Sequence, residues 1–407
     1  MTMNVEINRS VCGGNMRAIG CEIFGGSQTI GHLLTGWEVD RILEMTDDMT
    51  EYNAYHFVKN YPNIPVVNFS DWHNEEYLSQ LGEYDLLFAN NPCSGLSSIN
   101  RNASVDGAAN IHFYEVLFAI KNLKPKAFLI ENAPTLTGLG LPILRDIQYK
   151  LKDLYKLVII NDLAGNHHVA MHRRRTLVVG FRRDYFGDRV GNIDVESRSH
   201  YTIKDAFEGL SSSTPNMELD TKVLNSEFTR FYHLVEQGDS IMRTLARKYD
   251  DIKDQLTEDE ANRVLAFKTR YDSKSNIWDK SSYRVKLDGQ APSLTSIVQL
   301  MHPIEDRDLY IREYARLMGY PDSFIFYPNE CKCSIIQCLA QGVPVNFIRY
   351  ISNEIMKAFN GNLLKINGDV MYINQCSGIQ KRVIFTTTDF QSCTNIVKNN
   401  VVQSLWF

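Results

Sequence analysis

The feature that most constrains the fold is an alternation of short apolar runs with amphipathic stretches over the first 185 residues. The amphipathic stretches have helical spacing, as in residues 111–123 and 141–151, whereas the apolar runs have the length of buried strands. The strand-like runs are residues 16–24, 37–45, 64–70, 84–90, 126–132, 154–162 and 175–181. Strands that alternate with helices predict an α/β fold with a doubly wound, mostly parallel sheet. Ligands of such sheets bind beyond the carboxyl ends of the strands.

The alternation ends near residue 186, where the sequence becomes rich in Ser, Thr, Asn and Asp. A chain of 407 residues can hold two cores, because a single core stops growing at roughly 250–300 residues. We therefore predict a catalytic sheet domain at 1–185 and a smaller second domain at 186–285. Residues 286–362 are expected to return to the sheet domain and complete it, and residues 363–407 to form a β-like extension.

The formal net charge of -5 argues against a surface covered in positive charge, so any nucleic acid must meet a local basic face. Aromatic residues interleave with the densest group of bases, which also contains many acids, so solvated amphipathic helices are the alternative to a phosphate-binding face. These bases are Arg243, Arg247, Lys248, Lys253, Arg263, Lys268, Arg270, Lys274, Lys280, Arg284 and Lys286.

No apolar run approaches the roughly 20 residues that span a bilayer, and the amino end lacks the pattern of a signal peptide. We therefore expect no membrane partner and a cytoplasmic location. The 8 cysteines are scattered and are expected to be reduced. Cys331, Cys333 and Cys338 lie close together in sequence, but no CxxC pair or histidine cluster completes a four-ligand set. We therefore predict no metal.

The strand-like residues 84–90 lead directly into Asn91, Pro92 and Cys93, which a Ser- and Gly-rich loop follows. A thiol at the mouth of a sheet is exposed to ligand, and nearby cationic groups can ionise it, as nucleophilic catalysis requires. Taken alone, Cys93 is more typical of a buried structural cysteine.

A second strand, at residues 126–132, ends in Glu131 and Asn132, where its carboxyl group can converge with the thiol of Cys93. A carboxyl kept protonated by a dry site can donate to a ring nitrogen and make a pyrimidine susceptible to attack by a thiolate. Arg173 and Arg175 lie on one face just before the last strand and could orient Glu131. Strand-end capping and a basic surface are the alternative readings of these residues.

Near the amino end, a strand is followed by Phe24, Gly25 and Gly26 and then by a helix. The backbone amides of such a tight turn can meet a ligand. Glu44 at the end of the next strand is placed where a carboxylate commonly binds ribose hydroxyls, and Asp71 follows the third strand. Together these residues outline a site for a cofactor that contains a nucleoside.

The order of these motifs resembles that of the cytosine-5 DNA methyltransferases, from about residue 16 to residue 360 apart from the middle domain. NPCSGLS is similar to the family's Pro-Cys nucleophile loop, LIENAP to its Glu-Asn motif, and HRRRTLVVGF to its paired-arginine motif. APSLTS with HPIEDRDLYIREYARLMGYPDSF is similar to its late motif before the closing helix.

The resemblance implies a Rossmann-like S-adenosylmethionine-dependent methyltransferase sheet domain with a target-recognition domain, acting on double-stranded DNA in a bacterial or phage-infected cell. It implies that Cys93 adds to carbon 6 of a flipped-out cytosine, whose stacked form would hide the reacting face. Glu131 would hold the ring nitrogen and amino group, with Arg173 and Arg175 positioning the base and Glu131. The expected contacts are Pro92, Ser94 and Asn132 for the base, and Phe24, Gly25, Gly26, Glu44 and Asp71 for S-adenosylmethionine.

Three departures from the family pattern bear on the cofactor. Cys21-Glu22-Ile23-Phe24 replaces the usual aromatic residue and extra glycine, Met171 replaces a glutamine, and Ala340-Gln341-Gly342 replaces a Gly-Asn pair. Gln341 is expected beside the methionine part of the donor. A derivative of S-adenosylmethionine as donor, RNA as substrate, and a catalytically silent DNA-binding scaffold stay open as alternatives. We expect a monomer or a weak dimer.

Overall fold

The computed structural model describes residues 16–22, 26–45, 54–92, 95–96, 102–196, 200–222, 228–273, 279, 281–295, 299–375, 380–394 and 396. The chain divides into two compact units. Unit 1 comprises residues 1–168, 173–200 and 342–407, and unit 2 comprises residues 169–172 and 201–341. None of the helices in the described ranges has the length and apolar character needed to cross a membrane.

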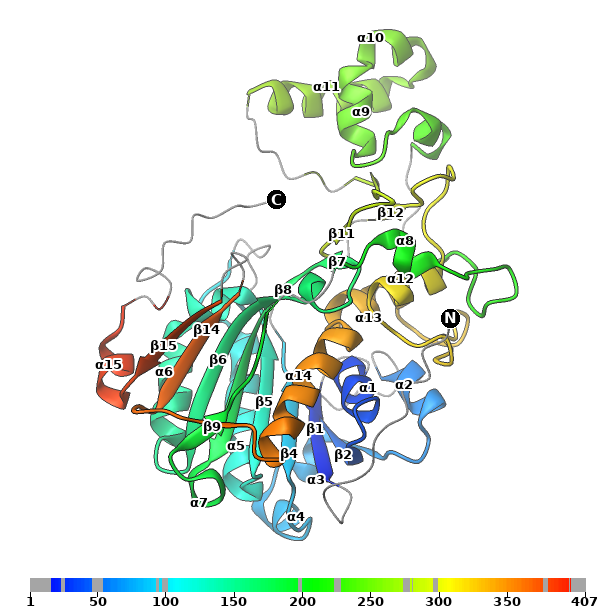
Figure 1. The fold of residues 1–407 in the computed structure, drawn as a ribbon. Coiled ribbons are helices and arrows are strands. Elements are labelled where there is room, and N and C mark those ends of the chain that lie inside the picture. Colours follow the sequence, from blue (N-terminus) through cyan, green and yellow to red (C-terminus); the bar gives the residue numbers. More distant parts are fainter. Residues whose placement is uncertain are drawn as a thin grey trace. The chain divides into compact units, whose positions relative to one another are not determined.

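Unit 1 is built on a mixed nine-stranded sheet whose strand order is β15-β14-β6-β8-β5-β4-β1-β2-β3 (Figure 1). Strands β1 to β5 run parallel to one another, whereas β8 is antiparallel to both β5 and β6. The nine strands are β1 (Arg17–Glu22), β2 (Glu38–Glu44), β3 (Val66–Val67), β4 (Leu86–Asn90), β5 (Ala127–Asn132), β6 (Tyr155–Leu163), β8 (Arg174–Arg182), β14 (Val370–Asn374) and β15 (Lys381–Phe385). The α/β class predicted from the alternation is therefore confirmed.

Helices cover the sheet of unit 1, with α5 and α6 packed behind it and α1 and α14 in front (Figure 1). The helices of this unit are α1 (Ser27–Leu33), α2 (Tyr55–Asn60), α3 (Phe69–Trp72), α4 (Glu75–Ser79), α5 (Ile111–Leu123), α6 (Leu141–Leu151), α7 (Arg183–Phe186), α14 (Val345–Phe359) and α15 (Thr387–Ser392). Two further strands, β9 (Arg189–Gly191) and β13 (Leu363–Lys365), pair antiparallel. This pairing keeps residues just beyond the predicted boundary at 185 in unit 1.

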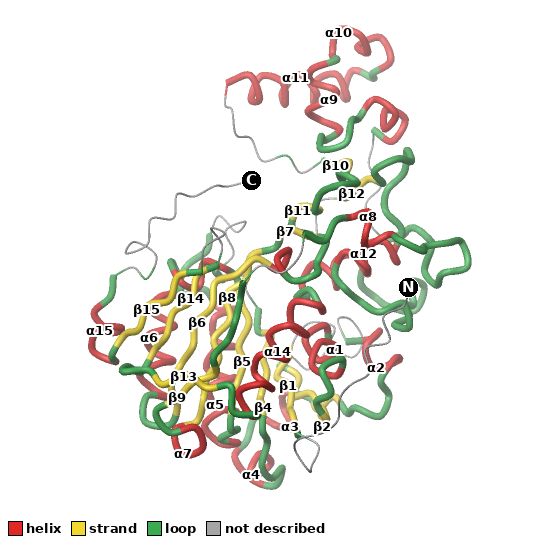
Figure 2. Tube along the Cα trace, in the orientation of Figure 1, coloured by secondary structure: helices red, strands yellow, loops and turns green. Residues whose placement is uncertain are grey.

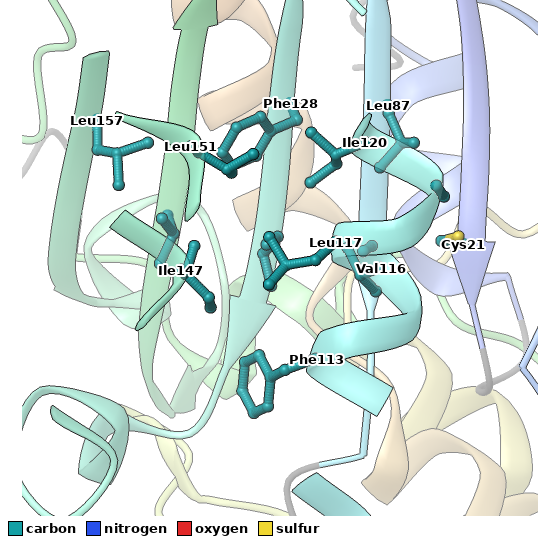
Figure 3. Packing of buried hydrophobic residues seen from close by; sticks show 14 of the residues in the cluster. Cys21, Leu87, Phe113, Val116, Leu117, Ile120, Phe128, Ile147, Leu151 and Leu157 are labelled. Atoms are coloured by element: carbon teal, nitrogen blue, oxygen red, sulfur yellow. The ribbon is translucent and has the colours of Figure 1, made fainter. Parts of the chain in front are cut away.

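The main core lies between the sheet and the helices α5 and α6. Figure 3 shows Val116, Leu117 and Ile120 of α5 directed toward the strands, with Phe128 of β5 beside them. Phe128 pairs with Gly180 of β8, where an added Cβ would lie 2.0 Å from the Phe128 ring. Only glycine therefore fits opposite this phenylalanine, and the interior tolerates little change of volume.

Residues 370–374 and 381–385 extend the sheet. Strand β14 pairs parallel with β6, and β15 pairs antiparallel with β14. Asn161 of β6 donates to the hydroxyl of Tyr372 in β14 at 3.0 Å and to that of Thr137 at 2.8 Å, and it accepts from Thr176. Arg183 forms an ion pair of 2.6 Å with Asp369. Strands β14 and β15 are therefore an integral part of the sheet of unit 1.

Long loops, short helices, the longer α11 and short strand pairs make up the described part of unit 2 (Figure 2). Its boundary at Gln341 lies beyond the residue 285 expected from composition, because residues 286–341 cluster with the second unit. The elements are β7 (Met171–His172), α8 (Ile203–Phe207), α9 (Ile241–Arg247), α10 (Tyr249–Ile252), α11 (Glu258–Ser273), β10 (Tyr283–Arg284), β11 (Ala291–Pro292), β12 (Leu300–Met301), α12 (Ile311–Leu317) and α13 (Ile335–Gln341).

Candidate functional site

Four neighbouring strands of unit 1 place polar side chains in one row at their carboxyl ends. Glu44 of β2 pairs in register with Glu22 of β1, Glu22 with Asn90 of β4, and Asn90 with Glu131 of β5. All four residues are buried. Because buried polar groups need partners, a row of carboxyl and amide groups at this edge of a parallel sheet is typical of a ligand site.

Glu131 in this row forms an ion pair with an arginine. Its Oε1 lies 2.6 Å from Nε of Arg175, and its side chain is almost completely buried. Burial raises the pKa of the Glu131 carboxyl above its ordinary value, although the charges of Arg175 and Arg173 act in the opposite direction. The predicted convergence of Glu131 and Arg175 is therefore present, in an environment that favours a protonated carboxyl.

Arg173 is buried and takes a second role. Its guanidinium donates to the carbonyl oxygen of Gly342 at 2.8 Å, and the next backbone N–H, that of Val343, donates to the hydroxyl of Ser27 at 3.0 Å. Ser27 begins α1, directly after the predicted cofactor turn. Residues 342 and 343 therefore connect the arginine motif to the cofactor turn within unit 1.

Asn132 connects the ends of two strands. Its amide donates to the carbonyl oxygen of Asn91 at 3.2 Å, and its side-chain oxygen accepts from the backbone N–H of Ala133 at 2.9 Å. Asn91 and Pro92 are buried. Cys93 and Ser94, the predicted nucleophile and its neighbour, lie outside the described residues. Asn132 thus fixes the segment that leads into Cys93.

The predicted cofactor turn is described at Gly26, whereas Phe24 and Gly25 lie outside the described residues. Gly26 has a φ of 69°, in the left-handed region that favours glycine. A Cβ at this position would lie 2.2 Å from the ring of Phe57. Both the backbone conformation and the close approach of Phe57 therefore require glycine.

Glu22 is a site residue whose role the sequence did not reveal. Its carboxyl oxygens accept from the backbone N–H and the hydroxyl of Thr29, each at 3.1 Å, so a strand residue caps the first turn of α1. Burial, with a smaller contribution from the charge of Glu131, raises the pKa of Glu22 to about 8 against the hydrogen bonds from Thr29 and Gln28. In the sequence, Glu22 stands out only as part of the departure from the family's first motif.

Glu44 is buried at the end of β2, as its predicted role with a ribose requires, and its carbonyl oxygen accepts from the indole of Trp72 at 2.5 Å. Asp71 lies in α3 and is exposed. Gln341 is the last residue of α13, is exposed, and belongs to unit 2. The structure thus brings Glu44 into the row of strand ends, and the roles of Asp71 and Gln341 stay predictions.

Several buried amide groups at this edge have polar atoms without a hydrogen-bond partner among the described residues. They belong to the side chains of Gln28, Asn90 and Asn91. Gln28 lies in the first turn of α1, Asn90 ends β4, and Asn91 directly follows it. Since an unpaired buried amide is destabilising by about 1–3 kcal/mol, this arrangement favours a polar ligand at the strand ends.

The basic stretch of unit 2 is partly used within the unit. Arg284 is buried and donates to the carbonyl oxygens of Tyr232, His302 and Glu305. Arg247 pairs with Asp239. These two arginines therefore stabilise unit 2, and the remaining exposed bases are the candidates for phosphate contacts.

Comparison with known proteins matches the C-5 cytosine-specific DNA methylase family over residues 22–357. The chain is 24% identical over 365 residues to the Type II methyltransferase M.PspPI of Psychrobacter sp. (strain TA137), covering 83% of this chain and 79% of that protein. It is 25% identical over 379 residues to the Type II methyltransferase M.XorII of Xanthomonas oryzae pv. oryzae, covering 84% and 85%.

Two solved structures share the fold. A protein described as a DNA modification methyltransferase encoded within a prophage of E. coli superposes with a TM-score of 0.57 at 18% identity, covering 85% of this chain and 100% of that chain. The methyltransferase EhMeth of Entamoeba histolytica gives a TM-score of 0.52 at 12% identity, covering 85% and 99%. The family match covers most of the chain, and it confirms the resemblance read from the motifs. The chain therefore belongs to the C-5 cytosine-specific DNA methylase family.

Proposed function

We propose that the enzyme transfers a methyl group from S-adenosylmethionine to carbon 5 of a cytosine flipped out of duplex DNA, with Cys93 as the nucleophile. The observation that carries this assignment is the buried Glu131, held by Arg175 at the end of the strand beside the one that leads into Cys93. A carboxyl with a raised pKa can donate its proton to the ring nitrogen of cytosine. Such donation makes carbon 6 of the ring electrophilic.

In the proposed reaction the Cys93 thiolate forms a bond to carbon 6 while Glu131 donates to the ring nitrogen, so that carbon 5 becomes nucleophilic. When bound, S-adenosylmethionine would supply the electrophilic methyl group to carbon 5 and leave as S-adenosylhomocysteine. Water acting as a base then takes the proton from carbon 5, the bond between Cys93 and carbon 6 breaks, and the ring nitrogen returns its proton to Glu131, which restores the aromatic ring. Arg175 keeps Glu131 in place, and Arg173, through Gly342, keeps the arginine motif in register with the start of α1.

The residues of unit 1 fit the cofactor. Gly26 provides the open turn, and Glu44 ends β2 at the position that commonly holds a ribose. The unpaired amides of Gln28 and Asn90 offer donors and acceptors to a polar ligand. Phe24, Gly25 and Asp71 complete the proposed set in unit 1. Unit 2 is proposed to read the DNA sequence in the groove.

The test expresses the wild type, Cys93→Ala and Cys393→Ala in a host without cytosine methylation and weighs the nucleosides of its DNA and RNA by mass spectrometry. Cys393 is a half-buried thiol of α15's carboxyl end and serves as the matched control. We expect methylated deoxycytidine with the wild type and the control, and none with Cys93→Ala.

The other outcomes distinguish the alternatives. An added mass on deoxycytidine larger than that of a methyl group would show that the donor is a derivative of S-adenosylmethionine. An adduct confined to RNA cytidine would overturn DNA as the substrate. Unmodified nucleosides from cells that contain the folded wild-type protein would overturn the enzymatic role and leave a DNA-binding scaffold. Methylation that persists in Cys93→Ala would overturn the assignment of the nucleophile.

A further inference from the structure

We propose that Cys331, Cys333 and Cys338 of unit 2 form a thiolate site for one zinc ion. The Sγ atom of Cys333 lies 3.1 Å from that of Cys331 and 2.9 Å from that of Cys338. Cys331 and Cys333 belong to the loop before α13, and Cys338 lies within α13. Spacing in the sequence indicated no metal site, whereas the fold makes all three thiols converge.

The three thiols are shielded from solvent. Cys331 and Cys338 are buried, and Cys333 is half-buried. Zinc binds thiolates, so a bound ion would replace the protons of the three thiols.

A scaffold independent of the thiols holds this loop. The carboxylate of Asp220, itself buried, accepts from the hydroxyl of Ser334 at 2.7 Å and from the backbone N–H of Ile336 at 3.0 Å. The backbone N–H of Cys331 donates to the carbonyl oxygen of Tyr327 at 3.2 Å. Loop and helix are therefore joined without a metal, as expected for a preorganised ligand set.

The geometry favours a shared ion over a disulfide. In tetrahedral coordination at a Zn–S distance of about 2.3 Å, thiolates lie roughly 3.8 Å apart, so the two measured separations need to widen by less than about 1 Å. A disulfide would draw two sulfurs to about 2.05 Å and leave the third thiol buried without its hydrogen-bonded neighbours. Zinc instead engages all three thiolates, and water or another ligand takes its fourth position.

The test measures zinc by mass spectrometry in the full-length wild type, Cys333→Ser, Cys338→Ser and the control Cys393→Ser, each purified without chelator. We expect about one zinc per chain in the wild type and the control, and at least a tenfold loss in both site variants. Cobalt added to metal-stripped wild type should give thiolate-to-cobalt absorption that the site variants lack.

Alkylation keeps the test decisive where a serine variant fails to fold. In the native wild type, zinc should protect the peptide that contains the three cysteines, and chelation should expose it, while Cys393 reacts equally in both states. Absence of zinc and of cobalt absorption in the folded wild type would overturn the proposal. The proposal would also be overturned if the mass of the unreduced chain were lower by two hydrogens and two of its thiols reacted only after reduction, because this result identifies a disulfide.

Discussion

Replacing Glu22 by glutamine should make unit 1 less sensitive to alkaline pH. Glutamine keeps an oxygen that can accept from Thr29, but it carries no titrating proton. Burial raises the pKa of Glu22 from 4.5 to about 8 in the folded protein. Between these two values the folded state holds a proton that the unfolded state has released, so the free energy of unfolding falls as the pH rises.

The magnitude follows from the width of this window. A fully linked proton changes the free energy of unfolding by about 1.4 kcal/mol per pH unit, which amounts to about 3 kcal/mol between about pH 5 and about pH 7.5. We expect the stability of Glu22→Gln relative to the wild type to increase by that amount over this range. The rest of the protein titrates equally in both chains, and its contribution cancels in the difference.

The assay is urea unfolding of both proteins at a series of pH values, followed by tryptophan fluorescence. Trp37 and Trp72 are buried in unit 1 and report on its unfolding. Glu38→Gln, at an exposed position in β2, is the control for the loss of a carboxylate from this unit. A stability difference between Glu22→Gln and the wild type that stays constant with pH would refute a protonated carboxyl at Glu22.

Gly26→Ala should destabilise the protein by about 3 kcal/mol in thermal unfolding, because it adds both backbone strain and a clash. Gly36→Ala, where φ is 102° and no neighbour lies within 4 Å, should show only the strain of about 1 kcal/mol, and equal losses would contradict this reasoning. Tyr372→Phe removes one hydrogen bond of Asn161 and should lower the stability by about 1 kcal/mol. Asn161→Ala removes all three of these hydrogen bonds and should lower it by about 3 kcal/mol, a difference that the same melting experiment measures. Glu131→Gln should lower kcat about 100-fold, because glutamine cannot donate a proton to the ring nitrogen. It should also flatten the alkaline limb of the rate–pH profile, because the protonated Glu131, whose pKa is raised by burial, is the active form and is lost as the pH rises. An alkaline limb that persists in this variant would assign it to another group.

The strand ends were predictable because buried runs and the polar residues that follow them can be read directly from the sequence. Glu131 and Arg175 were placed together by this reasoning, and their ion pair is present. Glu22 was noticed only as a departure from a motif, because a hydrogen bond from a strand to the next helix has no periodic signal. The partner of Arg173 is a backbone carbonyl at Gly342, and contacts with backbone atoms leave no trace in side-chain patterns.

The boundary of unit 2 was harder to place, because composition records polarity and not contact. Residues 286–341 contain segments with the apolar spacing of helices, like those of the sheet domain. They nevertheless belong to the second compact unit. The thiols show a related limit. Their convergence depends on the turn that leads into α13, which the spacing of the cysteines does not encode.

The pairing of β14 with β6 also sets an order of assembly. Leu157 of β6 pairs with Val370 of β14, and all of residues 201–341 lie between these partners in the chain. During synthesis from the amino end, β6 therefore leaves the ribosome long before its neighbour, while unit 2 is made in the interval. The nascent sheet must wait with an unpaired and apolar edge, which is prone to pairing with other chains. Pairing of β14 with β6, and of β15 with β14, ends that exposure. Lys381 and Arg382 of β15 then place exposed charged side chains at the edge of the sheet.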